Sequence, residues 1–240
     1  MLALLLSLTV CPTCELKDIQ SAVDLAKPGE RIVVKAGTYK GPLLITKSLE
    51  IVGENEPVID GEGKHQVITV VADGVRVEGL VIKNSGMSYT EDVAGLKVKN
   101  SKDCVIRKNK FVNNFFALYL EGVKGCKVEN NSIIGFAKTE GSSGNGIHAW
   151  NSEDLYIKKN YVKGHRDGIY FEFVKGSTIE ENVSEGNLRY GLHFMFSNDN
   201  TFRRNRFYRN GAGVAVMYSK EVLIEENIFE KNSGPASYGF

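Results

Sequence analysis

Two sequence elements repeat along this chain with one common step, and that step limits the possible folds more than any other feature. An apolar-x-x-Asn element ends at six asparagines spaced by 22, 29, 22, 23 and 22 residues: Asn109, Asn131, Asn160, Asn182, Asn205 and Asn227. A small residue followed by alternating apolar positions recurs with the same spacings at Gly95, Ala117, Gly146, Gly168, Gly191 and Gly213. Because a fixed period of about 20–50 residues is typical of solenoids and propellers, we expect a chain of stacked repeats.

The repeated unit of 22 residues is predicted to hold short strands. Apolar residues alternate in segments such as 192–196 and 214–216, Gly and Asn turns separate these segments, and no useful helical i, i+3, i+4 stripe is found. In a parallel coil, equivalent residues of successive turns stack about 4.8 Å apart. The sequence therefore predicts an all-β fold, a right-handed parallel β-helix of the pectin-lyase-like kind with about 22 residues per coil.

The two irregular regions of the repeat indicate insertions into single coils, at 138–145 and 85–94. A second turn column is predicted through Asn114, Phe136, His165, Asn187, Asn210 and Asn232. His165 occupies a place in this column that is mostly filled by asparagine. We therefore interpret His165 as a structural residue rather than a catalytic or metal-binding one.

The N-terminal residues 1–10 form an apolar run that is typical of a secretory signal, although no basic residues precede it and it is too short to span a bilayer. Export from the cytoplasm is expected, with residues 1–14 as a signal-like N-terminus and residues 15–240 as one β-helix domain. Cys11 leaves lipidation open, but Val10 is larger than the residue that normally precedes a lipidated cysteine.

The four cysteines form two pairs in the sequence. Cys11 and Cys14 could bind a metal or form a redox pair, but cysteines lying idle near a cleavage site are the preferred interpretation. Cys104 and Cys126 share one inward coil position, where a disulfide is geometrically possible. A buried thiol pair is the preferred interpretation there.

The charge of the chain is almost balanced, with 30 basic and 29 acidic residues and a formal net charge of +1. Proteins that bind nucleic acid commonly carry an excess of basic residues, because neutralisation of phosphates supplies much of their affinity. We therefore expect no nucleic-acid partner.

One face of the coil carries side chains unusual for a solvated surface. Counted from each small residue of the second repeat, positions +1 and +3 are apolar and must point inward, so positions +2 and +4 must point outward. The outward pairs are Lys97/Lys99, Tyr119/Glu121, His148/Trp150, Tyr170/Glu172, His193/Met195 and Ala215/Met217. Aromatic, His and Met residues on such a face indicate a ligand or a partner.

Four of these residues form a set of soft donors. His193 and Met195 lie two apart on one predicted strand, Met217 lies directly above Met195, and Glu172 lies directly below it. An imidazole and two thioethers beside a carboxylate suit Cu(I) and are poor ligands for Mg²⁺ or Ca²⁺. His148 and Trp150 are expected to act as surrounding or transfer residues. The alternative is an apolar stripe, covered by an insertion or a partner, in which Met is used for adaptable packing.

The segment 168–220 carries the most specific sequence similarity. Its motifs Gly-Ile-Tyr-Phe-Glu-Phe-Val, Tyr-Gly-Leu-His-Phe-Met-Phe-Ser-Asn-Asp and Gly-Ala-Gly-Val-Ala-Val-Met-Tyr-Ser resemble the core of NosD proteins, and 234–239 continues the match. The resemblance covers roughly residues 15–240. It implies a periplasmic accessory protein that docks on ABC transporter subunits, receives copper from a lipoprotein chaperone and helps to assemble the copper sites of apo nitrous oxide reductase. NosD proteins are longer, so we expect C-terminal coils to be missing here.

Two other classes of function remain open, because a β-helix is also the scaffold of polysaccharide lyases, hydrolases and epimerases. A glycoside hydrolase needs two carboxylates across one bond. On the outward face the candidates are Glu121 and Glu172, two coils or roughly 10 Å apart. We therefore expect a protein that is not an enzyme, with a carbohydrate-active protein and a scaffold without metal as the alternatives.

Overall fold

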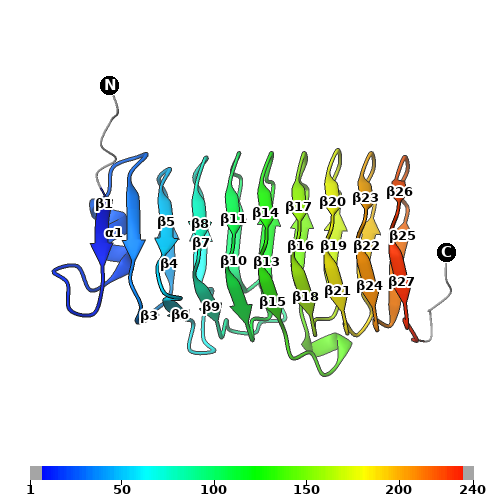
Figure 1. Cartoon of the computed structure of the whole chain (residues 1–240), viewed down its shortest axis with the longest axis horizontal. Coiled ribbons are helices and arrows are strands. Elements are labelled where there is room, and N and C mark those ends of the chain that lie inside the picture. The colour runs from blue at the N-terminus through cyan, green and yellow to red at the C-terminus, as the bar shows by residue number, and fades with distance from the viewer. Residues whose placement is uncertain (1–6, 235–240) are drawn as a thin grey trace.

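The computed structural model describes residues 7–234, which wind into a right-handed solenoid of three parallel sheets (Figure 1). Sheet A contains β1 (Ser7–Val10), β2 (Arg31–Val34), β5 (Glu50–Gly53), β8 (Arg76–Glu78), β11 (Val105–Arg107), β14 (Lys127–Glu129), β17 (Tyr156–Lys158), β20 (Thr178–Glu180), β23 (Thr201–Arg203) and β26 (Leu223–Glu225). Each complete coil adds one strand to each sheet, so the predicted parallel β-helix is confirmed.

The other two sheets complete each coil. Sheet B contains β3 (Thr38–Lys40), β6 (Val58–Asp60), β9 (Val81–Lys83), β12 (Lys110–Val112), β15 (Ser132–Ile134), β18 (Tyr161–Lys163), β21 (Val183–Glu185), β24 (Arg206–Tyr208) and β27 (Ile228–Glu230). Sheet C contains β4 (Leu43–Ile45), β7 (Ile68–Val70), β10 (Ala94–Lys99), β13 (Phe116–Glu121), β16 (Ile147–Trp150), β19 (Ile169–Glu172), β22 (Tyr190–Met195) and β25 (Ala212–Met217). The core lies between the three sheets.

The core is built from stacked columns of apolar side chains. The central residue of each short strand points inward, and in sheet A these residues are paired from coil to coil, as Ile106 with Val128 and Ile157 with Ile179. All four are fully buried. Because successive residues of a strand alternate between its faces, the flanking residues of the same strands point outward.

The predicted asparagine ladder is confirmed by its hydrogen bonds. The backbone N of Asn109 donates to Oδ1 of Asn131 at 3.0 Å, and the same bond recurs up the column to Asn227. The residue before each ladder asparagine adopts a left-handed conformation, as Lys108 does with φ 54°. The column therefore turns the chain from sheet A to sheet B and links successive coils.

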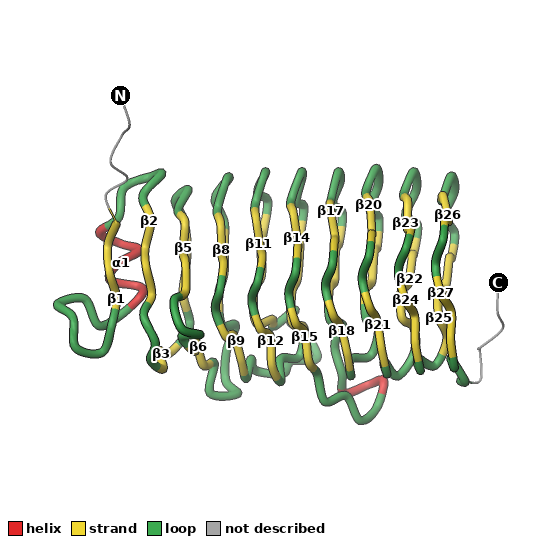
Figure 2. The backbone as a smooth tube through the Cα atoms, in the orientation of Figure 1, coloured by secondary structure: helices red, strands yellow, loops and turns green. Residues whose placement is uncertain are grey.

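The second turn column is continuous only in its upper part. The backbone N of His165 donates to Oδ1 of Asn187, and Asn187 is linked in the same way to Asn210. Phe136 breaks the column, because its side chain is 65% exposed. The insertion that follows Phe136 contains the short 3₁₀ helix η1 (Glu140–Ser142) and protrudes from the corner of the coil without breaking the stack (Figure 2).

A single helix covers the N-terminal end of the solenoid. Helix α1 (Ile19–Leu25) begins after Asp18, whose carboxylate accepts a hydrogen bond from the backbone N of Ser21, and its buried side chains face the first coil.

Strand β1 lies within the stretch expected to be signal-like and pairs with β2, while residues 1–6 lie outside the described residues. Residues 235–239 of the NosD-like match also lie outside them. No helix within 7–234 is long and apolar enough to cross a membrane.

Both cysteine pairs are disulfide-bonded, so the preferred interpretations of both pairs are wrong. Cys104 and Cys126 are fully buried and bonded across one rung, with their Cα atoms 4.5 Å apart. Cys11 and Cys14 are bonded across a turn, with their Cα atoms 5.0 Å apart. Both distances fall in the range that a disulfide spans, and the stacked coils direct the two buried side chains toward the same interior space.

Candidate functional site

The predicted donor residues lie on the outer face of sheet C in two neighbouring columns. The register pairs Glu172 with Met195 and Met195 with Met217, so these three side chains follow one another along the solenoid. A second column, two residues earlier in each strand, runs through Lys97, Tyr119, His148, Tyr170, His193 and Ala215. Because residues i and i+2 of a strand share a face, His193 and Met195 point to the same side of sheet C.

The four aromatic and His rings of the second column, which we call the His–Tyr column, are buried. His148 is 6% exposed and His193 is 2% exposed. The rings stack with centroid separations of 4.6 Å from Tyr119 to His148, 4.7 Å from His148 to Tyr170 and 4.6 Å from Tyr170 to His193. These positions point away from the core as predicted, but the expectation of an open face needs correction here. Side chains of the chain itself cover the column: Phe116, Asn145 and Arg189 contact its rings.

The first column, which we call the Met column, is open to solvent. Glu172, Met195 and Met217 are each partly exposed, and Trp150, which pairs with Glu172 from the coil below, is 38% exposed. Trp150 thus lies two rungs below Met195.

The residues that follow this column form an exposed stack of aromatic rings. Phe173, Phe196 and Tyr218 stack at centroid separations of 5.2 and 4.9 Å. All three adopt a left-handed conformation, with φ between 50° and 54°, which bulky residues rarely adopt. Sequence reasoning missed this stack, although the aromatic residues recur at the coil step.

His193 lies against a buried ion pair. Its Nδ1 is 3.5 Å from Oδ2 of Asp167, a fully buried carboxylate that also accepts hydrogen bonds from Nε and Nη2 of Arg189 at 2.9 and 2.5 Å. Burial alone would raise the pKa of Asp167, but the bonds from Arg189 and His193 lower it to about 2. The Nε2 atom of His193 is buried and has no hydrogen-bond partner. A buried nitrogen without a partner is unfavourable unless a ligand occupies it.

His148 has a different neighbour. Its Nδ1 is 3.2 Å from Nδ2 of Asn145, and its Nε2 also has no hydrogen-bond partner. Burial lowers the pKa of His148 to about 3, so the ring is neutral near pH 7. The structure therefore places His148 two coils below His193, as predicted, with Tyr170 between the two rings.

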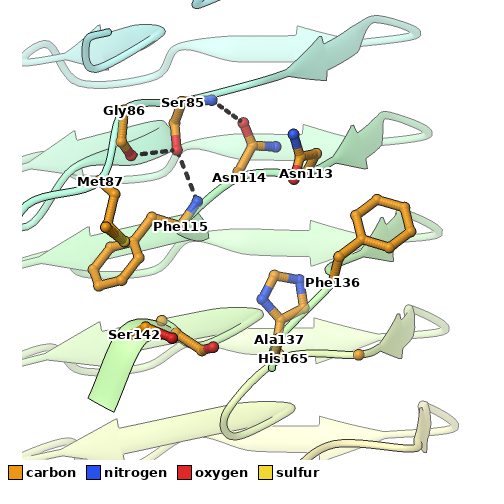
Figure 3. Close-up of a pocket in the computed structure, with 13 residues that line it drawn as sticks. Ser85, Gly86, Met87, Asn113, Asn114, Phe115, Phe136, Ala137, Ser142 and His165 are labelled. Carbon is orange, nitrogen blue, oxygen red and sulfur yellow. Dashed lines mark hydrogen bonds between the residues drawn. The ribbon is translucent and has the colours of Figure 1, made fainter. Parts of the chain in front are cut away.

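His165 lies apart from the donor residues, at the corner between the two insertions. Figure 3 shows it beside a pocket that Met87, Phe115 and Phe136 also line. Burial lowers the pKa of His165 to about 4. Its backbone belongs to the second turn column, which agrees with a structural role.

The chemistry of the outer face depends on its thioethers. Within 7–234 no group of three or more His, Cys, Asp and Glu side chains is placed to hold a metal ion. Glu121, the second candidate carboxylate of the face, forms ion pairs with Lys97 and Lys99 at 2.9 and 3.0 Å. Burial would raise the pKa of Glu121, but these two lysines lower it. A carboxylate held in its charged form in this way is poorly suited to act as a general acid.

Sequence reasoning missed the polar residues around the two histidines. Asp167 and Asn145 occupy the position just before the ladder glycines Gly168 and Gly146. Other coils fill this position with Ala or an aromatic residue. An acid and an amide there were the signal that could have identified these two residues. Arg189 carried no comparable signal, since a lone arginine in a turn is common.

Comparisons with known proteins show what this chain is similar to. Residues 136–240 match the family model described as periplasmic copper-binding protein (NosD). Two curated relatives, each named "Probable ABC transporter binding protein NosD", are 33% identical (Pseudomonas aeruginosa) and 30% identical (Stutzerimonas stutzeri) over 135 residues. Both matches cover 55% of this chain, and 32% and 31% of the relatives. The matched part thus spans about a third of the length of these relatives.

Solved structures show the same fold at low sequence identity. The Dettilon tailspike protein has a TM-score of 0.64 at 17% identity, over 81% of this chain and 47% of that one. The A-module of mannuronan C-5 epimerase AlgE4 from Azotobacter vinelandii has a TM-score of 0.59 at 15% identity, over 90% and 74% of the two chains. These similarities show the β-helix and carry no information on activity.

The similarity to NosD proteins rests on the sequence matches. The match at 136–240 includes every residue of the predicted donor set and the three coils that carry it. The resemblance seen in the sequence is thereby confirmed: residues 136–240 match the NosD family model, and both curated relatives are named as NosD.

Proposed function

We propose that this chain is a periplasmic copper-binding accessory protein that works with an ABC transporter and delivers copper for the assembly of nitrous oxide reductase. The ligands proposed for Cu(I) are Met195, Met217 and His193, with Glu172 beside them. The names of the family and of the two relatives support periplasmic copper binding and association with an ABC transporter. The copper chaperone and the reductase are partners implied by the family resemblance.

One observation carries the proposal: two thioethers are paired in register beside a buried imidazole nitrogen that has no partner. Met195 and Met217 are opposite one another on β22 and β25, and His193 lies two residues from Met195 on β22. Adjacent strands are about 4.8 Å apart, so two flexible Met side chains can converge on one ion between them. Thioether and imidazole donors favour Cu(I) over the hard cations.

The partial exposure of the Met column suits a transferred ion. Met195 and Met217 are partly exposed, whereas the imidazole of His193 is buried and lies 3.5 Å from Asp167. Copper would serve as cargo here, since a partner could approach the two sulfur atoms directly. Glu172 adds a negative charge next to the cation and completes the donor set from the coil below.

Anaerobic titration with Cu(I) in competition with a colorimetric chelator tests the proposal. Met195→Ala and Met217→Ala should each weaken Cu(I) retention, and the double variant should lose at least about tenfold in affinity, because two of three ligands are removed. His165→Ala should leave Cu(I) binding nearly unchanged and should lower stability instead.

Met87→Ala is the matched control, because Met87 is an exposed methionine outside the two columns. Its Cu(I) affinity should equal that of the wild type. If the double variant of Met195 and Met217 competes for Cu(I) as well as the wild type, the copper site proposed on this face is wrong.

A further inference from the structure

The two buried histidines of the His–Tyr column have polar neighbours of opposite kinds. Nδ1 of His193 faces a carboxylate oxygen of Asp167 at 3.5 Å, whereas Nδ1 of His148 faces the amide nitrogen of Asn145 at 3.2 Å. In both rings Nε2 is buried without a partner. Because a neutral imidazole carries its proton on one nitrogen only, the neighbour of Nδ1 decides what Nε2 can do.

The orientation of the Asn145 amide follows from its other contacts. Its Oδ1 is 3.3 Å from Nε of Arg166 and 3.3 Å from the backbone N of Asp167, and both of these groups can only donate. The oxygen must therefore face them, and the NH₂ group must face His148. Nδ1 of His148 then accepts a hydrogen bond, so the proton of this ring resides on Nε2. That nitrogen has no lone pair for a metal.

Asp167 imposes the opposite arrangement on His193. A charged carboxylate can only accept, so a neutral His193 must donate from Nδ1 to make this bond. Nη2 of Arg189 lies 3.4 Å from Nδ1, but it makes its shorter bond, 2.5 Å long, to Oδ2 of Asp167. The negative charge of that carboxylate favours a ring proton on the nitrogen that faces it. With the proton on Nδ1, the lone pair of His193 lies on Nε2. Carboxylates orient many metal-binding histidines in this way.

We infer that Asp167 is a positioning residue that sets His193 in the Nδ1–H tautomer and makes its Nε2 the nitrogen ligand of the Met column, whereas Asn145 sets His148 in the Nε2–H tautomer and withholds it from the metal. The metal part of this inference rests on the proposed function. The tautomers themselves are properties of the metal-free protein. The two assignments thus make His193 a metal ligand and leave His148 without a metal-binding nitrogen.

Nitrogen NMR of the metal-free full chain, labelled with ¹⁵N in its four histidines, tests the assignment directly. In their neutral forms the His193 ring should show a protonated Nδ1 and the His148 ring a protonated Nε2. Asp167→Asn places an amide where the carboxylate was, so His193 should change to the Nε2–H form and Cu(I) affinity should fall about 10–100-fold. Asn145→Asp should change His148 to the Nδ1–H form.

Asp92→Asn is the matched control, because Asp92 is a carboxylate that contacts the same column through Tyr119. It should leave the His193 tautomer and the Cu(I) affinity unchanged. A His193 ring that is Nε2–H in the wild type, or one that stays Nδ1–H in a folded Asp167→Asn variant, overturns the inference. If Asp167→Asn does not fold, the Asn145→Asp variant tests the inference instead. A His148 ring that stays in the Nε2–H form in that variant overturns the inference. Should the tautomers be as stated while the Met195 and Met217 double variant keeps its Cu(I), the copper proposal fails and the tautomer assignment stands.

Discussion

A single ladder asparagine joins three coils of the solenoid. Oδ1 of Asn182 accepts hydrogen bonds from the backbone N and from Nδ2 of Asn160 at 2.9 and 3.0 Å. Its Nδ2 donates to Oδ1 of Asn205 and to the carbonyl of Ile157 at 3.0 and 2.8 Å. The side chain is 1% exposed, so water cannot replace these partners. Each buried group left without a partner costs about 1–3 kcal/mol.

Asn182→Ala should therefore lower the free energy of unfolding by about 2–4 kcal/mol, because it leaves the backbone N of Asn160 unpaired inside the solenoid. Urea unfolding at pH 7 measures the loss. Asn227→Ala is the matched control from the last coil of the ladder, where the bonds to Asn205 are only partly buried and water can replace them. Equal losses in the two variants would contradict this account.

The strands of sheet A are joined covalently at one rung. Cys104 and Cys126 come just before β11 and β14, and their bond closes a loop of 22 residues. Removal of a disulfide that closes a loop of this length destabilises a protein by about 3 kcal/mol in the chain-entropy model. The paired variant Cys104→Ala/Cys126→Ala should melt at a clearly lower temperature.

The second disulfide supplies the control, because Cys11 and Cys14 are separated by only three positions. The variant Cys11→Ala/Cys14→Ala should melt closer to the wild type. Mass spectrometry after alkylation without reductant should find no blocked thiols in the unfolded wild type. Two blocked thiols at Cys104 and Cys126 would show that this rung is not bridged.

The elements that the sequence predicted are those fixed by stacking. A step of 22 residues determines which strand pairs with which, so the ladder from Asn109 to Asn227 and the pairing of Met195 with Met217 followed directly. The burial of the His–Tyr column could not be predicted, because it depends on how far the side chains of Phe116 and Asn145 reach over neighbouring rings. The role of Asp167 was hidden for the same reason, since it acts on a histidine of the next coil.

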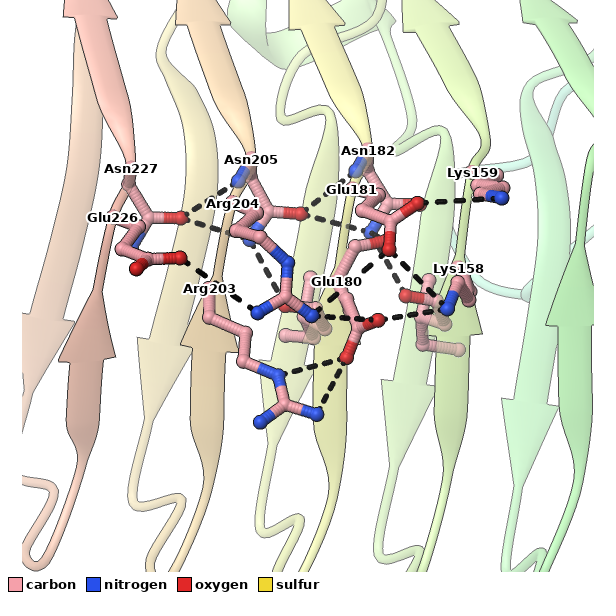
Figure 4. A network of polar contacts seen from close by, with 12 residues as sticks. Lys158, Lys159, Glu180, Glu181, Asn182, Arg203, Arg204, Asn205, Glu226 and Asn227 are labelled. Atoms are coloured by element: carbon pink, nitrogen blue, oxygen red, sulfur yellow. Dashed lines mark hydrogen bonds and ion pairs between the residues drawn. The ribbon is translucent and has the colours of Figure 1, made fainter.

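Along the whole molecule, three buried carboxylates link neighbouring coils: Glu78, Asp167 and Glu180. Glu180 pairs with Lys158, Arg203 and Arg204 on the coils below and above it (Figure 4). The bond from Lys158 is the main reason why the pKa of Glu180 is lowered to about 2. Burial alone would raise the pKa of Glu78, but Arg107 and Arg76 lower it to about 2, as Arg189 and His193 do for Asp167.

These pKa values and those of two buried histidines predict a stability profile with two acid-sensitive windows. The pKa values of His148 and His165 are lowered from 6.5 to about 3 and about 4, so the unfolded chain binds protons below about pH 6.5 that the folded chain does not. Stability should therefore begin to fall as the pH drops below that point. The three carboxylates stabilise the fold above their ordinary pKa values, and this contribution is lost as the pH falls from about 4.5 toward 2.

The urea midpoint should thus be nearly constant above pH 7, decline between pH 6.5 and 4.5, and decline more steeply below pH 4.5. His165→Asn should reduce the decline in the first window, because it removes one buried histidine from a column that asparagine otherwise fills, and it should leave the second window unchanged. His65→Asn is the control, since it removes an exposed histidine. If His165→Asn and the wild type decline in parallel between pH 6.5 and 4.5, the proton uptake that destabilises the solenoid there does not come from His165. A urea midpoint that rises on acidification would contradict this prediction, because the folded solenoid would then bind more protons than the unfolded chain.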